Sequence, residues 1–218
     1  MSTDNPDETA PVLPHQVYAD ALRAHAVTLI WLGYQRLNAS SFAVAEEDDI
    51  TGELVREMKL VAQDPSSPDW VDHYEIHEQD PQNVNSKRGK HRPKMDIEIE
   101  CHRRGLRPRL GFEAKRLGRG NSVGDYLDDK GLGAFLTGYY PTTHGEAGML
   151  GYVQEQTPED WSVKLATSLN DNREKYRVAT KGVWRSFNAD VASSSFCTSH
   201  TDASSNPLFV IHVLLPFA

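Results

Sequence analysis

Two segments of the chain, 94–102 and 109–117, alternate apolar side chains with polar or charged ones. Because successive side chains of a β-strand point to opposite faces, each segment predicts a strand with one apolar and one charged face. Gly105 and Pro108 lie between the segments and favour a turn. We therefore expect an antiparallel hairpin whose apolar faces coincide against a core, which leaves the charged faces together on the other side.

The charged face of this hairpin collects several carboxylates and one lysine. Folding about 105–106 sets which side chains lie opposite one another, and the alternation sets which face they share. Asp96 and Glu113 then form a diagonal pair about 7–8 Å apart at the backbone, within reach of a shared metal ion. The expected pairs are Asp96 with Lys115, Glu98 with Glu113, and Glu100 with Gly111.

Clustered carboxylates repel one another unless a cation lies between them. Hard oxygen ligands completed by water suit Mg2+ or Mn2+ rather than Zn2+. Such an ion neutralises charge on a phosphate oxygen and lowers the pKa of a bound water, and a neighbouring lysine stabilises the charge that develops on phosphorus. The pattern Asp96…Glu113-x-Lys115 therefore predicts phosphodiester hydrolysis. The alternative is a charge-paired amphipathic hairpin without chemistry.

A helix is predicted over 49–62, where apolar residues recur at helical spacing until Asp64-Pro65. Glu57 falls inside the apolar stripe of this helix, and Glu53 lies at its edge. An inward-facing carboxylate costs free energy unless it is paired with a cation or takes part in chemistry, and both explanations stay open for these acids. The stripe consists of Ile50, Leu54, Met58 and Val61.

The hairpin and the helix before it together resemble a known nuclease family. Lys94-Met95-Asp96, followed by Gly111-Phe112-Glu113-Ala114-Lys115-Arg116-Leu117, resembles the core of the PD-(D/E)xK (restriction-endonuclease-like) nuclease superfamily. The likeness spans roughly residues 51–117, and Gly52-Glu53 resembles the helix glutamate that often precedes the metal-binding aspartate there. The chain departs from the signature at Pro93, which stands three residues before Asp96 instead of directly before it.

The resemblance implies a role for each of these residues. Asp96, Glu113 and the main-chain carbonyl of Ala114 would ligate Mg2+ (or Mn2+). Lys115 would position or activate the attacking water, and Glu53 would ligate a second metal ion or hold the ligands of the first. Two alternatives stay open: Glu57 in place of Glu53, and Glu98 in place of Asp96.

The charge of the chain is unevenly distributed. The whole sequence has a formal net charge of −8, yet twelve Lys and Arg side chains and only four Asp and Glu side chains lie between Lys87 and Arg119. A basic segment inside an acidic body suits local binding of phosphate groups, whereas a solvated basic loop is the simpler explanation. The residues that we expect at a nucleic-acid interface are Lys87, Arg88, Lys90, Arg92, Arg116, Arg119 and Lys130.

The chain as a whole predicts one α/β domain. Residues 1–14 are rich in Pro, Asp and Thr and are expected to form a disordered tail, and residues 15–218 a single domain. Two helices, three strands and then alternating helices and strands favour a mixed central sheet flanked by helices, and the resemblance implies a restriction-endonuclease-like core. The other expected elements are helices over 15–38, 124–137 and 158–175, strands over 73–78, 149–154, 177–187 and 208–215, and a loop over 192–206.

Composition excludes several classes of protein. No apolar stretch reaches the roughly 18–20 residues of a membrane span, and the polar, acidic first residues do not form a secretory signal. Two cysteines make neither a disulfide framework nor a zinc set. We therefore expect a cytoplasmic protein that does not bind membranes.

The leading hypothesis is a Mg2+-dependent endodeoxyribonuclease of the kind that serves bacterial restriction or antiviral (phage) defence. DNA is the expected substrate, and RNA is kept as an alternative. Because no separate sequence-reading domain is evident, a homodimer or a partner subunit would supply targeting. Two rival functions are a catalytically silent nucleic-acid-binding or scaffold subunit of the same fold and a protein-interaction domain with a basic hairpin.

Overall fold

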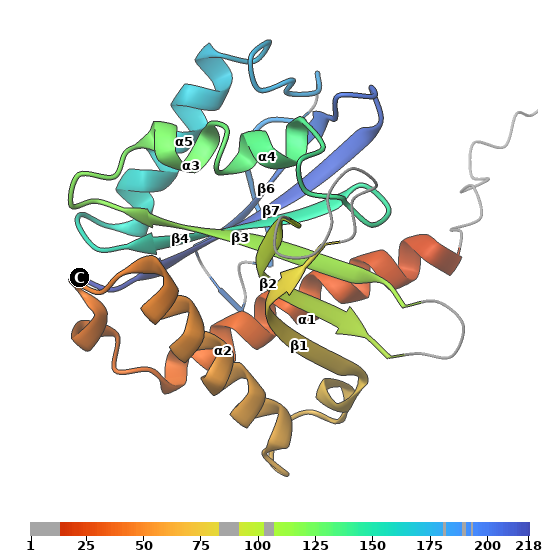
Figure 1. Cartoon of the computed structure of the whole chain (residues 1–218), viewed down its shortest axis with the longest axis vertical. Coiled ribbons are helices and arrows are strands. Elements are labelled where there is room, and N and C mark those ends of the chain that lie inside the picture. Colours follow the sequence, from red (N-terminus) through yellow and green to blue (C-terminus); the bar gives the residue numbers. More distant parts are fainter. Residues whose placement is uncertain (1–13, 83–91, 103–106, 181, 189–190, 193) are drawn as a thin grey trace, which may run out of the picture.

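The chain forms an α/β fold around one seven-stranded mixed sheet (Figure 1). The structure is a computed structural model that describes residues 14–82, 92–102, 107–180, 182–188, 191–192 and 194–218. The strands are β1 (Tyr74–Pro81), β2 (Lys94–Cys101), β3 (Arg109–Leu117), β4 (Glu146–Val153), β5 (Arg185–Ser186), β6 (Ser195–Thr201) and β7 (Pro207–Pro216).

The sheet is parallel at its centre and antiparallel towards both edges. Its strand order is β1-β2-β3-β4-β7-β6-β5, in which β3, β4 and β7 run parallel to one another. All eight residues of β4 are buried, as expected for a parallel strand that is covered on both faces. The expected α/β class, with a mixed sheet flanked by helices, is confirmed.

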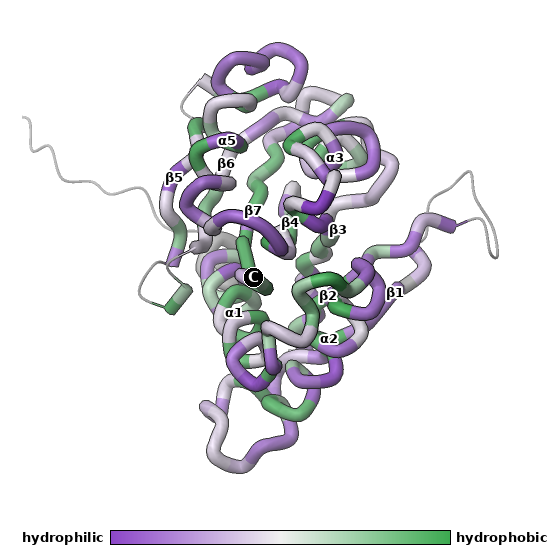
Figure 2. The backbone as a smooth tube through the Cα atoms, turned by 90° about the vertical axis from the view of Figure 1, so that its left-hand side faces the viewer, coloured by the Kyte–Doolittle hydropathy of each residue, from purple (hydrophilic) through white to green (hydrophobic). Residues whose placement is uncertain are grey.

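Helices cover both faces of the sheet, and the sheet separates two apolar cores (Figure 1). On one face α1 and α2 pack against Phe112 and Leu150, and on the other α3, α4 and α5 pack against Met149 and Leu214. Figure 2 shows the apolar tube of β7 inside and hydrophilic segments towards the outside. The helices are α1 (Pro14–Arg36), α2 (Glu47–Gln63), α3 (Val123–Leu127), α4 (Leu132–Leu136) and α5 (Pro158–Asp171), with short 3-10 turns at Ala39–Phe42 and Asp69–His73.

Helix α2 is held by its apolar stripe and by one buried hydrogen bond. The whole predicted stripe is buried against the sheet, and the helix begins two residues earlier than the sequence predicts. Within the helix, the hydroxyl of Thr51 shares a 2.9 Å hydrogen bond with the hydroxyl of Tyr152 on β4. This contact fixes the position of the first turn of α2 along the sheet.

The hairpin of β2 and β3 has the predicted parity but a different register. A shift of two residues keeps each paired side chain on its predicted face, so Ile97 and Phe112 lie together in the core. The predicted pairing itself is wrong by two residues. Glu98 lies opposite Gly111, and Glu100 lies opposite Arg109, where the sequence predicts Glu113 and Gly111.

Met95 is the exception to the predicted parity. The alternation places it on the same face as Ile97, whereas the structure packs it into the core cluster on the other face of the sheet. The ladder between β1 and β2 is interrupted beside it, because Gln79 adopts a φ of +47° and the pairing skips Gln79 and Asp96. The strand therefore turns its start towards α3 and α4.

One helix that the sequence predicts over 124–137 is two short helices, α3 and α4. The chain turns tightly between them, and Gly131 lies so close to the main chain that a Cβ there would be 2.0 Å from the carbonyl oxygen of Tyr126. Only a residue without a side chain fits this approach.

The prediction is also wrong near β6. Among the described residues of 177–187, only Arg185–Ser186 form a strand, β5, and Val178 makes an isolated bridge to His200. The loop predicted over 192–206 contains the seven-residue strand β6. The hydroxyl of Ser195 donates a 2.7 Å hydrogen bond to the carbonyl of Ala192, so this serine is buried without cost. A serine-rich strand of this kind has no apolar alternation that a sequence pattern can detect.

A chain of hydrogen bonds crosses the core beneath α3. The carbonyl of Tyr176 can only accept, so His200 donates through Nδ1 and accepts from the hydroxyl of Thr198. Thr198 in turn accepts from Nε2 of His212, whose Nδ1 accepts from the hydroxyl of Tyr126. Every member is satisfied with both imidazoles neutral, which agrees with the strongly lowered pKa that burial gives each histidine.

No helix within the described residues is long and apolar enough to cross a membrane. Helix α1 already begins at Pro14, and the rest of the expected tail over 1–14 lies outside the described residues. The expected turn at 105–106 also lies outside them.

The histidine chain predicts acid sensitivity of the fold. Burial lowers the pKa of His200 from its ordinary 6.5 to about 4, so the unfolded state binds more protons between these values and stability falls as the pH drops through this window. The full effect is about 3 kcal/mol of the free energy of unfolding. Thermal unfolding of His200→Gln between pH 7 and pH 4 should show a flatter profile than wild type, with the exposed His73→Gln as control. Parallel profiles would contradict this account.

Candidate active site

The site begins where β2 parts from β3. Pairing between the two strands stops after Ile97 and Phe112, and the next amide of β3 that faces β2 belongs to Ala114. A carboxylate oxygen of Asp96 accepts from this amide at 2.8 Å and replaces the missing main-chain partner. Two residues further along β3, the amide of Arg116 donates to Oε2 of Glu47 at 3.1 Å. The free edge of β3 is thus satisfied by two acidic side chains.

The ammonium of Lys115 lies at the centre of this group. Its Nζ donates to Oε1 of Glu113 at 2.8 Å, to Oε1 of Glu47 at 2.9 Å and to the carbonyl of Ala114 at 2.5 Å. Glu113 and Lys115 share one face of β3, whereas Glu47 comes from the first turn of α2. The lysine therefore connects the strand to the start of the helix.

Glu113 is a buried carboxylate that is only partly compensated. Its side chain is 7% exposed, and its buried Oε2 accepts no hydrogen bond of good geometry, although the hydroxyl of Tyr140 lies near the carboxylate. Burial, followed by the charge of Asp96, raises its pKa from 4.5 to about 7, while Lys115 and the hydroxyl of Tyr140 offset part of this rise. Unpaired buried carboxylate oxygens are costly, so this atom is the feature of the site that most needs an explanation.

The pKa values of Asp96 and Lys115 are also raised. Burial raises the pKa of Asp96, the charges of Glu47 and Asp48 add to this, and the Ala114 amide and Lys115 oppose it. Burial alone would lower the pKa of Lys115, but the charges of Glu113 and Glu47 outweigh it, so the net shift is upward. The lysine is therefore an ammonium at neutral pH.

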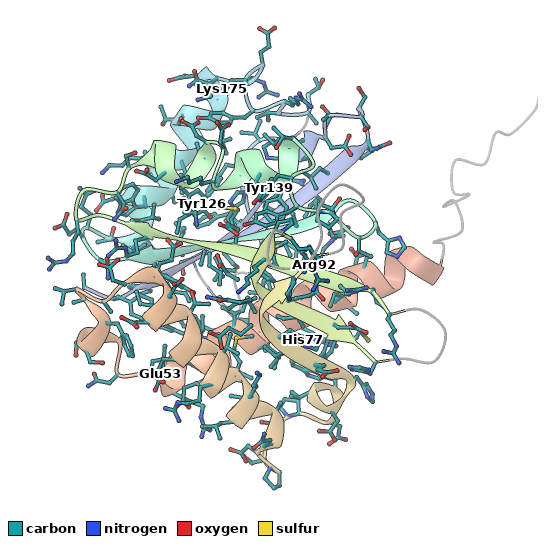
Figure 3. All side chains as sticks on the ribbon, in the orientation of Figure 1. Glu53, His77, Arg92, Tyr126, Tyr139 and Lys175 are labelled. Carbon is teal, nitrogen blue, oxygen red and sulfur yellow. The ribbon has the colours of Figure 1, made fainter. Side chains whose placement is uncertain are left out.

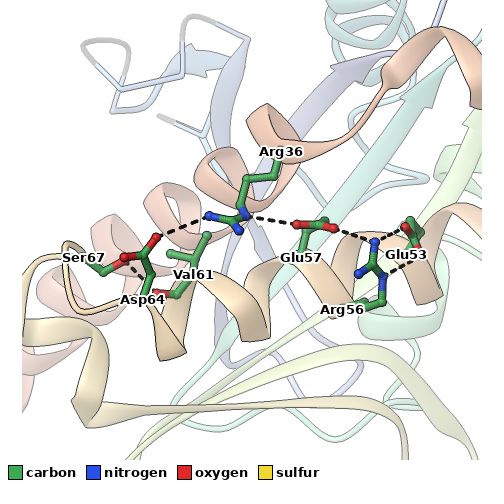
Figure 4. A network of polar contacts seen from close by, with 7 residues as sticks. All are labelled: Arg36, Glu53, Arg56, Glu57, Val61, Asp64 and Ser67. Atoms are coloured by element: carbon green, nitrogen blue, oxygen red, sulfur yellow. Dashed lines mark hydrogen bonds and ion pairs between the residues drawn. The ribbon is translucent and has the colours of Figure 1, made fainter.

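The predicted helix acids lie in a different network. Glu53 is partly exposed and pairs with Arg56, with oxygen–nitrogen distances of 2.9 and 2.5 Å (Figure 4). Glu57 is buried in the stripe, as the sequence predicts, and accepts from Arg36 at 3.0 Å and from Arg56 at 2.6 Å. Neither acid has a hydrogen bond or ion pair to the lysine of the site, and Figure 3 shows Glu53 on the outer side of α2. The structure does not bring them into the site.

Glu47 is the site residue that sequence reasoning missed. It lies two residues before the predicted start of α2, so the helical wheel did not include it. A usable signal exists in the run Glu46-Glu47-Asp48-Asp49, because acids in the first turn of a helix are placed at its positive end. Which of them turns towards β3 depends on how α2 packs, and the sequence does not state that.

The two alternatives Asp96 and Glu98 lie in different surroundings. Glu98 is 4% exposed and accepts from the amide of Gln82 at 3.1 Å and from Arg109 at 3.3 Å. Only Asp96 binds the edge of β3 next to Glu113. Glu98 lies on the same face of the sheet but further along it, in a neighbouring pocket.

An open groove of about 530 Å³ runs beside Lys115. Glu47 and Lys115 form one side, and the segment from Asn121 to Lys130 forms the other. Asp125, Asp128 and Asp129 also line this groove, so its walls are largely acidic. An anionic substrate therefore needs cations in this groove.

The residues expected at a nucleic-acid interface have mixed placements. Arg116 pairs with Glu46 at 2.9 Å, and Arg119 donates to the carbonyl of Ala43 at 2.8 Å, so both hold the segment before α2. Lys130 is exposed and lines the groove, and Arg92 is partly exposed just before β2 (Figure 3). The remaining three, Lys87, Arg88 and Lys90, lie outside the described residues.

The site offers oxygen donors of the kind that Mg2+ prefers. Among the residues that the structure describes, no three His, Cys, Asp or Glu side chains converge on a single metal position. Mg2+ usually keeps several waters and takes only one or two carboxylates, so this does not conflict with the expected ion. Asp96, Glu113 with its unpartnered Oε2, and the carbonyl of Ala114 supply hard oxygen donors next to one another.

Comparisons with known proteins add no assignment. No family model matches this chain, and neither a curated protein nor a solved structure does.

The burial of Glu113 predicts a pH effect on stability in metal-free buffer. The folded state holds a proton on this carboxylate up to about pH 7, whereas the unfolded state loses it near pH 4.5, so stability falls as the pH rises between these values. Glu113→Gln should remove this loss. At pH 8 the variant should unfold at a higher temperature than wild type, and its free energy of unfolding should be larger by up to about 3 kcal/mol.

The comparison needs EDTA and a matched control at a glutamate that is neither buried nor part of the site, for which the partly exposed Glu53→Gln is suitable. If Glu113→Gln lowers the unfolding temperature at pH 8, the carboxylate is stabilised by its surroundings and the account of its burial is wrong.

Proposed function

We propose that this chain is a metal-dependent nuclease of PD-(D/E)xK type that hydrolyses phosphodiester bonds of DNA. The observation that carries the proposal is the grouping of Asp96, Glu113 and Lys115 where β2 parts from β3, with a buried unpartnered oxygen on Glu113. The seven-stranded mixed sheet between helices is compatible with the restriction-endonuclease-like core that the sequence motif implies.

Mg2+ or Mn2+ is the proposed cofactor, held by Asp96, Glu113 and the Ala114 carbonyl. When bound, it would neutralise charge on a phosphate oxygen and acidify a water molecule. The raised pKa values of both carboxylates support this, because a cation between them would remove the repulsion and burial costs that raise them. The Ala114 carbonyl has a second lone pair beside the one that accepts from Lys115.

Lys115 acts as a fixed positive charge in this proposal. Glu113 and Glu47 raise its pKa, so it keeps its proton and does not serve as a general base at neutral pH. Hydrogen bonds to three acceptors fix the position of its Nζ. From there its charge stabilises the negative charge that develops on phosphorus. All three N–H groups of Lys115 already donate, so orienting the attacking water requires one of these hydrogen bonds to be exchanged for a bond to the water.

The substrate is proposed to be DNA because the site opens onto a groove rather than an enclosed cavity. Lys115 and Lys130 line this groove from its two sides, and Lys115 belongs to the basic segment between Lys87 and Arg119. RNA contains the same phosphodiester group, so it is tested alongside. A cytoplasmic role in restriction or phage defence, with targeting by a homodimer or a partner subunit, belongs to this proposal.

The second candidate is a catalytically silent nucleic-acid-binding or scaffold subunit of the same fold. Such a protein has no need of a buried carboxylate pair with a charged lysine, whose burial costs stability. The intact group of Asp96, Glu113 and Lys115 therefore favours the enzyme.

Cleavage of supercoiled plasmid and of linear duplex DNA in Mg2+ tests the nuclease. Wild type should nick both, and EDTA should stop it. Lys115→Ala should lower the rate by about 100-fold or more, because one electrostatic group aimed at the developing charge is lost. Equal cleavage by Lys115→Ala, or no cleavage of DNA and RNA by wild type in Mg2+ and in Mn2+, would contradict the proposal.

A matched pair on α2 tests the role of Glu47. Glu47→Gln removes a charge that holds Lys115 and the Arg116 amide, and we expect a roughly 10–100-fold lower rate. Glu53→Gln on the same helix should cleave at the wild-type rate, because Glu53 pairs with Arg56 outside the site. The reverse outcome would return the helix role to Glu53, as the sequence motif implies.

A further inference from the structure

A second pocket lies on the same face of the sheet as the candidate active site. It has a volume of about 180 Å³ and is bounded by β1, β2, β3, α4 and the segment that leads into β4. Gly111, two residues before Glu113 on β3, forms part of its lining. The rise of a strand places the two positions about 7 Å apart, a distance comparable to that between the phosphate and the base of one nucleotide.

The polar end of this pocket is a carboxylate next to a guanidinium. Glu98 is nearly fully buried and accepts from Gln82 at 3.1 Å and from Arg109 at 3.3 Å. A carboxylate has about four lone-pair positions, so two contacts leave acceptor capacity on the pocket side. Arg109 is exposed and lines the same pocket. An acceptor pair and a cationic donor therefore lie side by side.

The remaining walls are mixed, because buried apolar side chains lie beside the polar side chains of Thr143 and Glu146. Met95 and Phe135 line the pocket, and both are buried. Gly111 leaves room for Met95, since a Cβ at Gly111 would lie 2.8 Å from the methyl carbon of Met95. A closed cavity of about 150 Å³ accommodates benzene, so this open pocket of about 180 Å³ takes one ring of a base and leaves the rest of the base at its mouth. The position of Met95 results from the irregular start of β2 and is not a feature of a regular hairpin.

We propose that this pocket binds one base of the nucleic-acid substrate and that it selects guanine. The inference rests on the proposed nuclease function and adds the base preference of the same site. Guanine presents one acceptor, O6, followed by two adjacent donors, N1–H and the N2 amino group. Arg109 matches the acceptor, and Glu98 matches both donors. Adenine, cytosine and thymine lack two adjacent donors on this edge.

Binding of 5′-nucleotides in EDTA tests the pocket without any cleavage. Isothermal titration of wild type with 5′-GMP should give a dissociation constant at least about tenfold lower than with 5′-AMP, 5′-CMP or 5′-IMP. IMP is the decisive comparison, because it lacks only the N2 amino group, from which Glu98 would accept a hydrogen bond in GMP. Glu98→Gln should bind GMP and IMP equally. Glu159→Gln, at an exposed position in the first turn of α5 outside the pocket, should bind both as wild type does.

Several outcomes would overturn the proposal. Wild type that does not bind GMP at 10 mM, or that binds the four nucleotides equally, contradicts the proposal. A Glu98→Gln variant that keeps the wild-type preference for GMP contradicts it as well. The GMP and IMP comparison uses wild type alone, so it stands even if Glu98→Gln folds poorly. GMP selection without plasmid cleavage would refute the nuclease and retain the base pocket, whereas cleavage without GMP selection would do the opposite.

Discussion

The hydrogen bond from the Ala114 amide to Asp96 is the constraint on which the rest of the site depends. It replaces a main-chain contact at the point where β2 leaves β3, and an unsatisfied amide there would cost more than the bond itself returns. Because β2 departs, the outer edge of β3 is open to side chains, and Glu47 reaches it from α2. The gap that one strand leaves is therefore what makes room for Glu113 and Lys115.

Charge in this site is balanced only in part. Lys115 serves Glu113, Glu47 and the Ala114 carbonyl at once, while the second oxygen of Glu113 has no partner. A chain under selection for stability alone would replace such a group with apolar residues of similar volume, because buried ion pairs return little net stability. Buried charges that are only partly compensated are typical of sites that bind or transform a ligand. The acidic groove beside Lys115 adds to the demand for a cation.

Local patterns predicted much of this arrangement. Alternation alone placed Glu113 and Lys115 on one face of a strand, and helical spacing alone buried Glu57. Register was not predictable, because a shift of two residues keeps the same face and changes only which side chains meet. Glu47 was missed for a related reason: its role depends on where the first turn of α2 lies against β3, which Thr51 and its partner across the core decide. Long-range packing of this kind leaves no trace in a short sequence window.

The central claim is that Asp96 and Glu113 together hold a divalent cation. Electron paramagnetic resonance of Mn2+ titrated into wild type, Asp96→Asn, Glu113→Gln and Glu53→Gln measures this without reference to any substrate. The account predicts a bound ion in wild type and in Glu53→Gln, and at least about tenfold weaker binding in the other two variants. Equal Mn2+ binding by all four proteins, or none by wild type, would contradict it.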